Sequence, residues 1–410
     1  ALQDGTMIFI QSQLSGKKDV DGFNEKVEKE QMDKWNNSIT QLNAAVTILG
    51  PDHYLTPSYT ARKLYLEAYI LYYNLTTYKH KYTRENRDSC IAKLEDAVKL
   101  EENASYAYYL LGEVYSYCGK NALSRQAYEK YLRLNPKDGY AFVNLAGLAR
   151  REQNLVLADS LIQVALKVGS NQMAEFIDNV GDYYYIWDDY DNAMKFYKKS
   201  IEMNPTLVGP YLNMGVISKT NKDYKNAAYY YGKVLQYDST YAWAYNNLAN
   251  IYAGEKNYAK AIDYYNRAIK LDSNYHMAYS NLAISYEGLK QYDTALKLLH
   301  LSKSLEMYDA STYYSIAHVH YNKKNYDSSA LYYYYCTLLD STDAKSYYWM
   351  GRSYEKQGDT MLARLYYNQA GEIDTTYADP WEAIADLYYN DKNYSEAALW
   401  YALAVSKDTL

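Results

Sequence analysis

The sequence is poor in the residues that break helices and form covalent links. Its 410 residues include only 6 prolines, 18 glycines and 3 cysteines, so turn-dense β folds, glycine-rich linkers and collagen-like segments are not expected. Cys90, Cys118 and Cys336 are odd in number and far apart, which argues against a disulfide framework or a zinc site. There is no run of about 18 apolar residues, so we expect no membrane span.

The charge has no dominant sign. The chain carries 43 basic and 49 acidic residues, and without a basic half it lacks the electrostatic footprint of a nucleic-acid-binding protein. Apolar and aromatic side chains are abundant instead, at 49% and 16% of the residues, and 56 residues are tyrosines. A chain with this composition can bury much more surface than disordered segments do, so we expect an ordered fold.

A small residue recurs about every 34 residues from Ser105 to the C-terminus. The positions are Gly112, Ala146, Gly181, Gly215, Ala249, Ala283, Ala317, Gly351 and Ala385. Other small residues follow 12 and 19 positions later in most units, with large apolar residues between them. Short side chains at such intervals let two helices approach closely. Each unit is therefore predicted to be a pair of helices separated by a turn such as Lys256-Asn257-Tyr258.

This helix-turn-helix unit resembles the tetratricopeptide repeat family. Tyr252, Tyr286, Tyr354 and Tyr388 occupy the aromatic position that the family has in its first helix. The resemblance implies an all-α, right-handed superhelical solenoid in which the first helices line a concave groove. Helix pairs that cannot bury their apolar faces alone stack on their neighbours, which independently favours the same arrangement.

The repeat pattern also predicts the organisation of the chain. We expect nine repeats over residues 105–410, capping helices with one degenerate repeat over 26–104, and an N-terminal arm over 1–25. Within the second of these regions, apolar spacing predicts helices over 27–49, 58–79 and 89–100.

Motifs that carry chemistry are missing. The sequence has no G-x-S-x-G, H-E-x-x-H or C-x-x-C motif and no glycine-rich phosphate loop. His318 and His320 form the closest histidine pair, but residues two apart on a helix point to different faces. We therefore predict no catalytic residues, no metal, no cofactor and no enzymatic activity.

Five asparagines stand two residues before successive small-residue positions. They are Asn144, Asn179, Asn213, Asn247 and Asn281. A side-chain amide offers one acceptor and two donors, so a row of amides can pair with the backbone of an extended peptide. This register predicts a ladder along the concave groove. The alternative is that these amides form hydrogen bonds within the stack of repeats.

Aromatic side chains accompany the ladder on the first helices, where they are predicted to face the groove together with Arg352. They are Tyr106, Tyr109, Tyr140, Trp243, Tyr314, Tyr348 and Trp349. Aromatic residues supply much of the binding energy of protein interfaces. Tyr334 and Tyr335 lie in a run of four tyrosines on a second helix, not all of which can be buried, and we predict a convex-face interface there. The alternative is that their rings cover neighbouring helices.

These features predict a non-enzymatic scaffold or adaptor that binds a protein or an extended peptide in its concave groove, with no nucleic-acid partner. Two alternatives remain open: the substrate-recruiting arm of an enzyme whose catalytic domain lies elsewhere, and a structural subunit of a bacterial envelope or secretion assembly. The composition, and a start at Ala1 without Met, slightly favour an exported bacterial protein, periplasmic or on the cell surface, over a cytoplasmic one.

Overall fold

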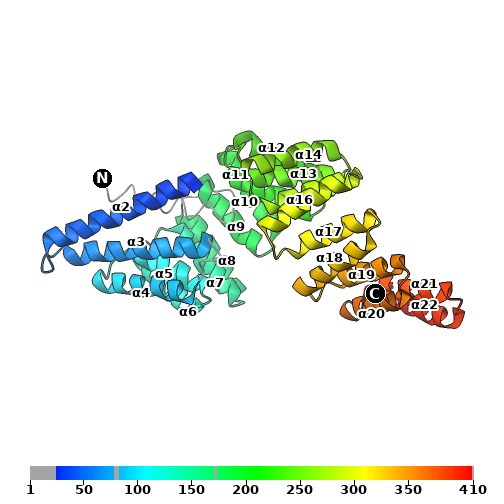
Figure 1. Ribbon diagram of the computed structural model, residues 1–410. Coiled ribbons are helices and arrows are strands. Elements are labelled where there is room, and N and C mark those ends of the chain that lie inside the picture. The colour runs from blue at the N-terminus through cyan, green and yellow to red at the C-terminus, as the bar shows by residue number, and fades with distance from the viewer. Residues whose placement is uncertain (1–24, 78–82, 170–172, 409–410) are drawn as a thin grey trace. The chain divides into compact units, whose positions relative to one another are not determined.

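The computed structural model describes residues 25–77, 83–169 and 173–408, and all regular secondary structure in these ranges is helical (Figure 1). The chain divides into two compact units, Ala1–Asp238 and Ser239–Leu410, called the N-terminal and C-terminal units below. The predicted fold class, an all-α solenoid of helix-turn-helix repeats, is confirmed within each unit. Among the described residues, no helix is both long enough and apolar enough to span a bilayer.

Helices follow one another in antiparallel pairs along both units. The N-terminal unit contains α2 (Glu25–Leu49), α3 (Thr56–Thr77), α4 (Arg84–Leu100), α5 (Ser105–Tyr117), α6 (Asn121–Leu134), α7 (Gly139–Arg151), α8 (Leu155–Val168), α9 (Ala174–Ile186), α10 (Tyr190–Met203), α11 (Val208–Thr220) and α12 (Tyr224–Tyr237). The C-terminal unit contains α13 (Ala242–Gly254), α14 (Tyr258–Leu271), α15 (His276–Gly288), α16 (Tyr292–Leu305), α17 (Ala310–Asn322), α18 (Tyr326–Leu339), α19 (Ala344–Gln357), α20 (Thr360–Ile373), α21 (Asp379–Asn390) and α22 (Tyr394–Asp408).

The turn inside each repeat has a recurring geometry. Lys256 adopts a left-handed backbone with φ of 60°, and the next residue, Asn257, donates its N–H to the carbonyl of Tyr252 at 2.8 Å. This closes the first helix with the hydrogen bonds of a left-handed C-cap. The side chain of Asn257 then accepts the N–H of Lys260 and caps the second helix. The turn predicted at Lys256-Asn257-Tyr258 is therefore confirmed.

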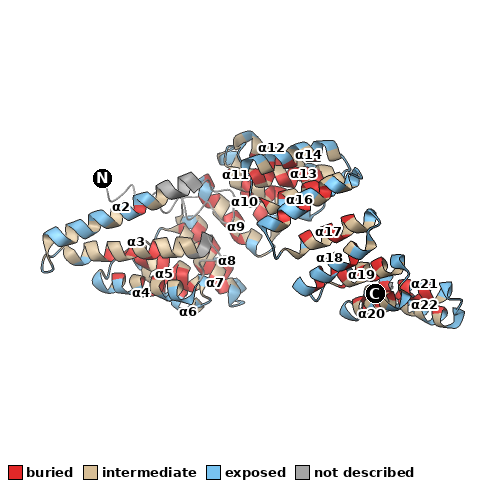
Figure 2. Ribbon diagram, in the orientation of Figure 1, coloured by how far each residue is buried: buried red, intermediate tan, exposed pale blue. Residues whose placement is uncertain are grey.

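The core of each repeat is a large side chain packed against the small residue of the first helix. Tyr197 on α10 is fully buried, and its ring lies so close to Gly181 on α9 that a Cβ there would stand 2.6 Å from the ring. Only glycine permits this approach. Figure 2 shows that buried residues lie on the helix sides that face their neighbours. Many of the abundant tyrosines are thus explained as packing between paired helices.

The first helices of the N-terminal unit match two of the three predicted ranges closely. α2 and α3 begin within two residues of their predicted starts and pack along each other (Figure 1), with Trp35 buried between them and ring contacts to Tyr69 and Tyr73. α4 begins at Arg84, five residues before its predicted start, because Thr83 caps it by accepting the N–H of Asn86. The predicted arm lies outside the described residues apart from Glu25, and so does the predicted helix end at Lys79.

Candidate functional site

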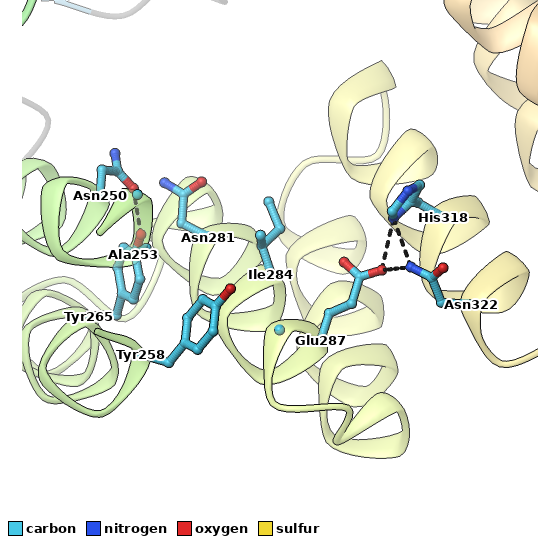
Figure 3. A pocket seen from close by; sticks show the side chains of 11 residues that line it. Asn250, Ala253, Tyr258, Tyr265, Asn281, Ile284, Glu287, His318 and Asn322 are labelled. Atoms are coloured by element: carbon cyan, nitrogen blue, oxygen red, sulfur yellow. Dashed lines mark hydrogen bonds and ion pairs between the residues drawn. The ribbon is translucent and has the colours of Figure 1, made fainter. Parts of the chain in front are cut away.

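A hollow of about 510 Å³ opens on the first helices of the C-terminal unit (Figure 3). Three consecutive first helices, α13, α15 and α17, supply most of its wall, and α14 adds two tyrosines. The lining residues are Asn250, Ala253, Gly254, Tyr258, Tyr265, Asn281, Ile284, Glu287, Gly288, His318 and Asn322. The hollow therefore lies on the helices that, by the family resemblance, are expected to line a groove.

Small residues create the space. Ala253 and Gly254 end α13, and a Cβ on Gly254 would meet no atom within 4 Å. Gly288 at the end of α15 is different, because a Cβ there would lie 2.4 Å from Cζ of Tyr258. The Tyr258 ring can occupy its place in the wall only because residue 288 has no side chain.

A hydrogen-bonded group forms one end of the hollow. Oε1 of Glu287 lies 2.8 Å from Nδ1 of His318 and accepts a hydrogen bond from Nδ2 of Asn322 at 2.7 Å (Figure 3). The His318 ring stacks on Tyr314 and meets Trp349 edge-on, with centroid distances of 6.4 Å and 5.4 Å. These contacts hold a carboxylate and an imidazole in one orientation.

Two amides form the other end. Tyr265 Oη donates to Oδ1 of Asn250 at 2.6 Å, and Nδ2 of Asn281 donates to Oδ1 of Asn246 at 3.1 Å. The remaining polar atoms, Nδ2 of Asn250 and Oδ1 of Asn281, have no hydrogen-bond partner among the described residues. The hollow thus presents one donor and one acceptor from neighbouring repeats.

The asparagines of the predicted ladder differ in their hydrogen-bond partners. In the N-terminal unit, Nδ2 of Asn144 donates to Glu113 at 2.6 Å and to the hydroxyls of Tyr109 and Tyr128 at 3.2 Å. Tyr128 also donates to Glu113. Burial, followed by the Glu113 charge, raises the pKa values of both tyrosines well above their usual value, so their hydroxyls remain protonated donors. This ladder position ties one repeat to the next.

Asn213 repeats that arrangement. Its Nδ2 donates to Oδ1 of Asp182 at 2.8 Å and to Oη of Tyr197 at 3.0 Å, and Tyr197 donates to the same carboxylate oxygen at 2.8 Å. We call such a set a tyrosine–acid–asparagine clasp. The donors of Asn144 and Asn213 are therefore engaged within the stack.

Asn179 and Asn247 have other surroundings. Asn247 is buried and donates to the carbonyl of Trp243 in its own helix at 3.0 Å. Asn179 belongs to no clasp, because the preceding repeat has Gly147 and Ile162 where the clasps have an acid and a tyrosine. Its Oδ1 is buried without a hydrogen-bond partner among the described residues. Two of the five predicted ladder residues, Asn144 and Asn213, thus share one role, and the other three have different surroundings.

The predicted aromatic residues are half-buried between repeats. Tyr106 donates to Glu101 at 2.7 Å. The others make ring or core contacts: Tyr109 with Tyr131, Tyr140 with Phe176, Trp243 with the cluster around Ala242, Tyr314 with Tyr333, Tyr348 with Tyr377, and Trp349 with Tyr321. Nε of Arg352 lies 3.9 Å from Oε2 of Glu355.

Two of these aromatic residues, Tyr314 and Trp349, reach the hollow through their ring contacts with His318. The two tyrosines predicted to form a convex-face interface, Tyr334 and Tyr335, lie exposed on the second helix α18.

Sequence reasoning missed Asn250, Glu287 and Asn322 as site residues. The available signal was their position on the first helices, one, four and five residues after the small residue of their repeats. His318 and His320 point to different neighbours, as predicted, since His320 stacks on Tyr332 at 5.6 Å.

The cysteines and the possible metal ligands can be described individually. Burial raises the pKa values of the Cys90 and Cys336 thiols to about 12, so neither is a thiolate near neutral pH. Among the described residues, no three His, Cys, Asp or Glu side chains converge in a way that could hold a metal ion.

Stacked helix pairs with a lined hollow define the class of helical repeat solenoids. Models of the tetratricopeptide repeat match residues 105–138, 174–207, 242–275, 264–297 and 345–373. The chain belongs to the tetratricopeptide repeat family, as the 34-residue pattern indicated. The repeats of this family support a protein-interaction scaffold. Among curated proteins, no sequence matches the chain.

Solved structures that resemble the chain include other repeat proteins. A tetratricopeptide repeat protein from Parabacteroides merdae is 17% identical with a TM-score of 0.49, over 57% of this chain and 93% of its own. PilF from Pseudomonas aeruginosa is 21% identical with a TM-score of 0.45, over 52% and 97%. One chain in the crystal structure of the APC/C hetero-tetramer Cut9-Hcn1 matches at 16% identity and a TM-score of 0.46, over 94% of this chain and 92% of its own.

Proposed function

We propose that the chain is a non-enzymatic scaffold that holds an extended segment of a partner protein in the hollow of the C-terminal unit. One observation carries the proposal: Nδ2 of Asn250 and Oδ1 of Asn281 have no hydrogen-bond partner among the described residues, and they border an apolar wall. A donor and an acceptor on successive repeats complement the C=O and N–H of an extended backbone.

The wall of the hollow between the side-chain amides of Asn250 and Asn281 and the carboxylate of Glu287 makes the apolar contact with the ligand. Ile284 is 45% exposed on α15, beside Ala253, and the two give one side chain of the ligand an apolar seat. Backbone recognition by the amides is tolerant of sequence, whereas the apolar seat at Ile284 and Ala253 favours an apolar side chain. We therefore expect selection for one apolar residue within an otherwise variable segment.

In this proposal only some of the ladder asparagines contact the ligand. Asn281 forms a hydrogen bond with the ligand. Asn144 and Asn213 instead stabilise the stack of repeats, because their side-chain N–H groups are engaged in clasps. Tyr314 and Trp349 contribute by holding His318 at the end of the hollow. Arg352 remains a predicted contact on α19.

A displayed library of linear peptides, selected on the immobilised full chain, tests the proposal without a known partner. Peptides recovered with the wild type are then titrated by calorimetry against the Asn250→Ala/Asn281→Ala double variant. Because two hydrogen bonds of about 1 kcal/mol each are lost, we expect affinity to fall by about tenfold or more. Asn390→Ala, at an exposed asparagine ending α21, is the matched control. Peptides that bind the double variant as tightly as the wild type would refute this site.

A further inference from the structure

The outer face of α18 carries an exposed apolar stripe. Leu331, Tyr334, Tyr335 and Leu338 are 48%, 46%, 39% and 62% exposed. Their spacing of three, four and seven residues places them on one side of the helix. The opposite side packs into the unit through buried residues such as Tyr333 and Cys336. The stripe therefore plays no part in the core of the repeat.

The equivalent face of another second helix shows how unusual this stripe is. Two repeats earlier, the corresponding positions on α14 are occupied by Asp263, Asn266, Arg267 and Lys270, all of which are exposed. On α18, by contrast, no residue from Ser328 to Leu339 is charged. A solvent-facing second helix of this array does not need apolar residues at these positions, so the stripe points to an interface.

The neighbouring second helix widens the apolar surface. Leu301 and Leu305 on α16 are exposed, and α16 contacts α18 where the His300 ring lies 6.2 Å from Tyr332. The Tyr335 ring lies 6.0 Å from Tyr313 of α17, and Lys303 of α16 covers the Tyr313 ring with its Nζ 5.6 Å from the ring centroid. Exposed positions along α18 are visible in Figure 2.

The order of residues in the stripe suits pairing with a second copy of this chain. Leucine, tyrosine, tyrosine and leucine read the same in both directions, and the spacing is symmetric about the midpoint between Tyr334 and Tyr335. We propose that the stripe pairs with α18 of a second copy of this chain, antiparallel and about a two-fold axis. Leu331 of each copy then contacts Leu338 of the other, and the four tyrosines meet at the centre.

Charge and symmetry both support self-pairing. A two-fold interface brings identical surfaces together, and an uncharged stripe does so without like-charge repulsion. Antiparallel packing also places the helix dipoles in their favourable relative orientation. Because one stripe with two flanking leucines is smaller than a typical interface of about 800 Å² per partner, we expect a reversible dimer that depends on concentration.

Sedimentation equilibrium of the full chain across a range of concentrations tests the pairing. The wild type is expected to shift from monomer to dimer. Leu331→Glu and Leu338→Lys each place an unpaired charge against a leucine and should weaken self-association by about tenfold or more. Leu399→Glu, at a leucine on α22 that is 66% exposed, is the matched control and should not change it. Circular dichroism checks that each variant is folded.

A mixture of the two charge variants tests the two-fold geometry itself. In the mixed dimer, Glu at 331 of one chain faces Lys at 338 of the other, and the second pair of positions keeps two leucines. The mixture should therefore associate more strongly than either variant alone. The proposal is overturned if the wild type stays monomeric at every concentration, if the single variants dimerise like the wild type, or if mixing does not restore association.

Discussion

The carboxylate of Glu287 on α15 lies 2.8 Å from Nδ1 of His318 on α17, so two successive repeats are joined at the end of the hollow. Asn322 donates to the same carboxylate oxygen from one turn further along α17. Burial, followed by the Asp343 charge, raises the pKa of Tyr314 to about 12, so the ring stacked on His318 stays neutral near physiological pH. The carboxylate of Glu287 thus joins two side chains of α17 at one end of the hollow.

Glu287→Ala should destabilise the C-terminal unit. The change leaves Nδ1 of His318 and Nδ2 of Asn322 without their shared acceptor, and we expect the free energy of unfolding to fall by about 1–3 kcal/mol. Urea denaturation followed by tryptophan fluorescence measures the loss. Glu306→Ala, at an exposed glutamate after α16, is the control. Equal midpoints for the two variants would show that the Glu287 contacts contribute nothing.

Two glycines that line the hollow should respond in opposite ways to alanine. Gly288→Ala forces a Cβ to within 2.4 Å of Tyr258 Cζ, and we expect a loss of about 1–3 kcal/mol of stability as the ring is displaced. Gly254→Ala meets no atom within 4 Å and should leave stability unchanged or raise it by about 0.5–1 kcal/mol, because alanine favours the helix. Thermal unfolding separates them. Similar melting temperatures would contradict the close packing at Gly288.

Substitutions at Asn213 test whether the clasp stabilises the N-terminal unit. Asn213→Ala removes the donor to Asp182 and Tyr197 and should cost about 1–2 kcal/mol. Asn213→Asp places a second carboxylate beside Asp182 and should cost more at neutral pH than at acidic pH, where the repulsion is relieved. Chemical denaturation at both pH values provides the comparison. An aspartate variant as stable as the alanine variant at pH 7 would argue against the clasp.

The buried carboxyl group of Asp178 should make the free energy of unfolding depend on pH. Burial, followed by the charges of Asp182 and Glu175, raises the pKa of Asp178 well above its usual value of 3.8. The folded chain then holds this proton more tightly than the unfolded chain. Stability from this group is accordingly present below about pH 4 and is lost as pH rises through the folded pKa.

Asp178→Asn removes that dependence. We expect the variant to be more stable than the wild type at pH 7, with the difference shrinking toward pH 4. Urea midpoints measured across this range provide the test, and Asp159→Asn at an exposed position on α8 is the control. A variant that is less stable than the wild type at pH 7 would show that the charged carboxylate is favoured in the fold.

Some features of the site follow from the repeat alone and others do not. The register of Asn144, Asn213 and Asn281 on first helices is correctly predicted, because a 34-residue period repeats each helix position. The hydrogen-bond partners of these amides differ, because they depend on the side chains that the preceding repeat supplies. Glu113 and Asp182 complete clasps, whereas Gly147 cannot. Direct ligand binding by the ladder residues remains a prediction.

The sequence by itself determined the helices, their pairing and the family. These depend on contacts within a repeat and between adjacent repeats, and spacing along the chain encodes such contacts directly. Only the tertiary structure decided where space and unpaired polar atoms are left. The hollow arises because Ala253 and Gly254 on α13 and Gly288 on α15 are small, and the absence of a side chain at Gly288 lets the Tyr258 ring of α14 take its place in the wall. Which outer faces carry exposed apolar stripes is likewise settled by packing, because burial on one side of α18 leaves Leu331 and Leu338 facing solvent.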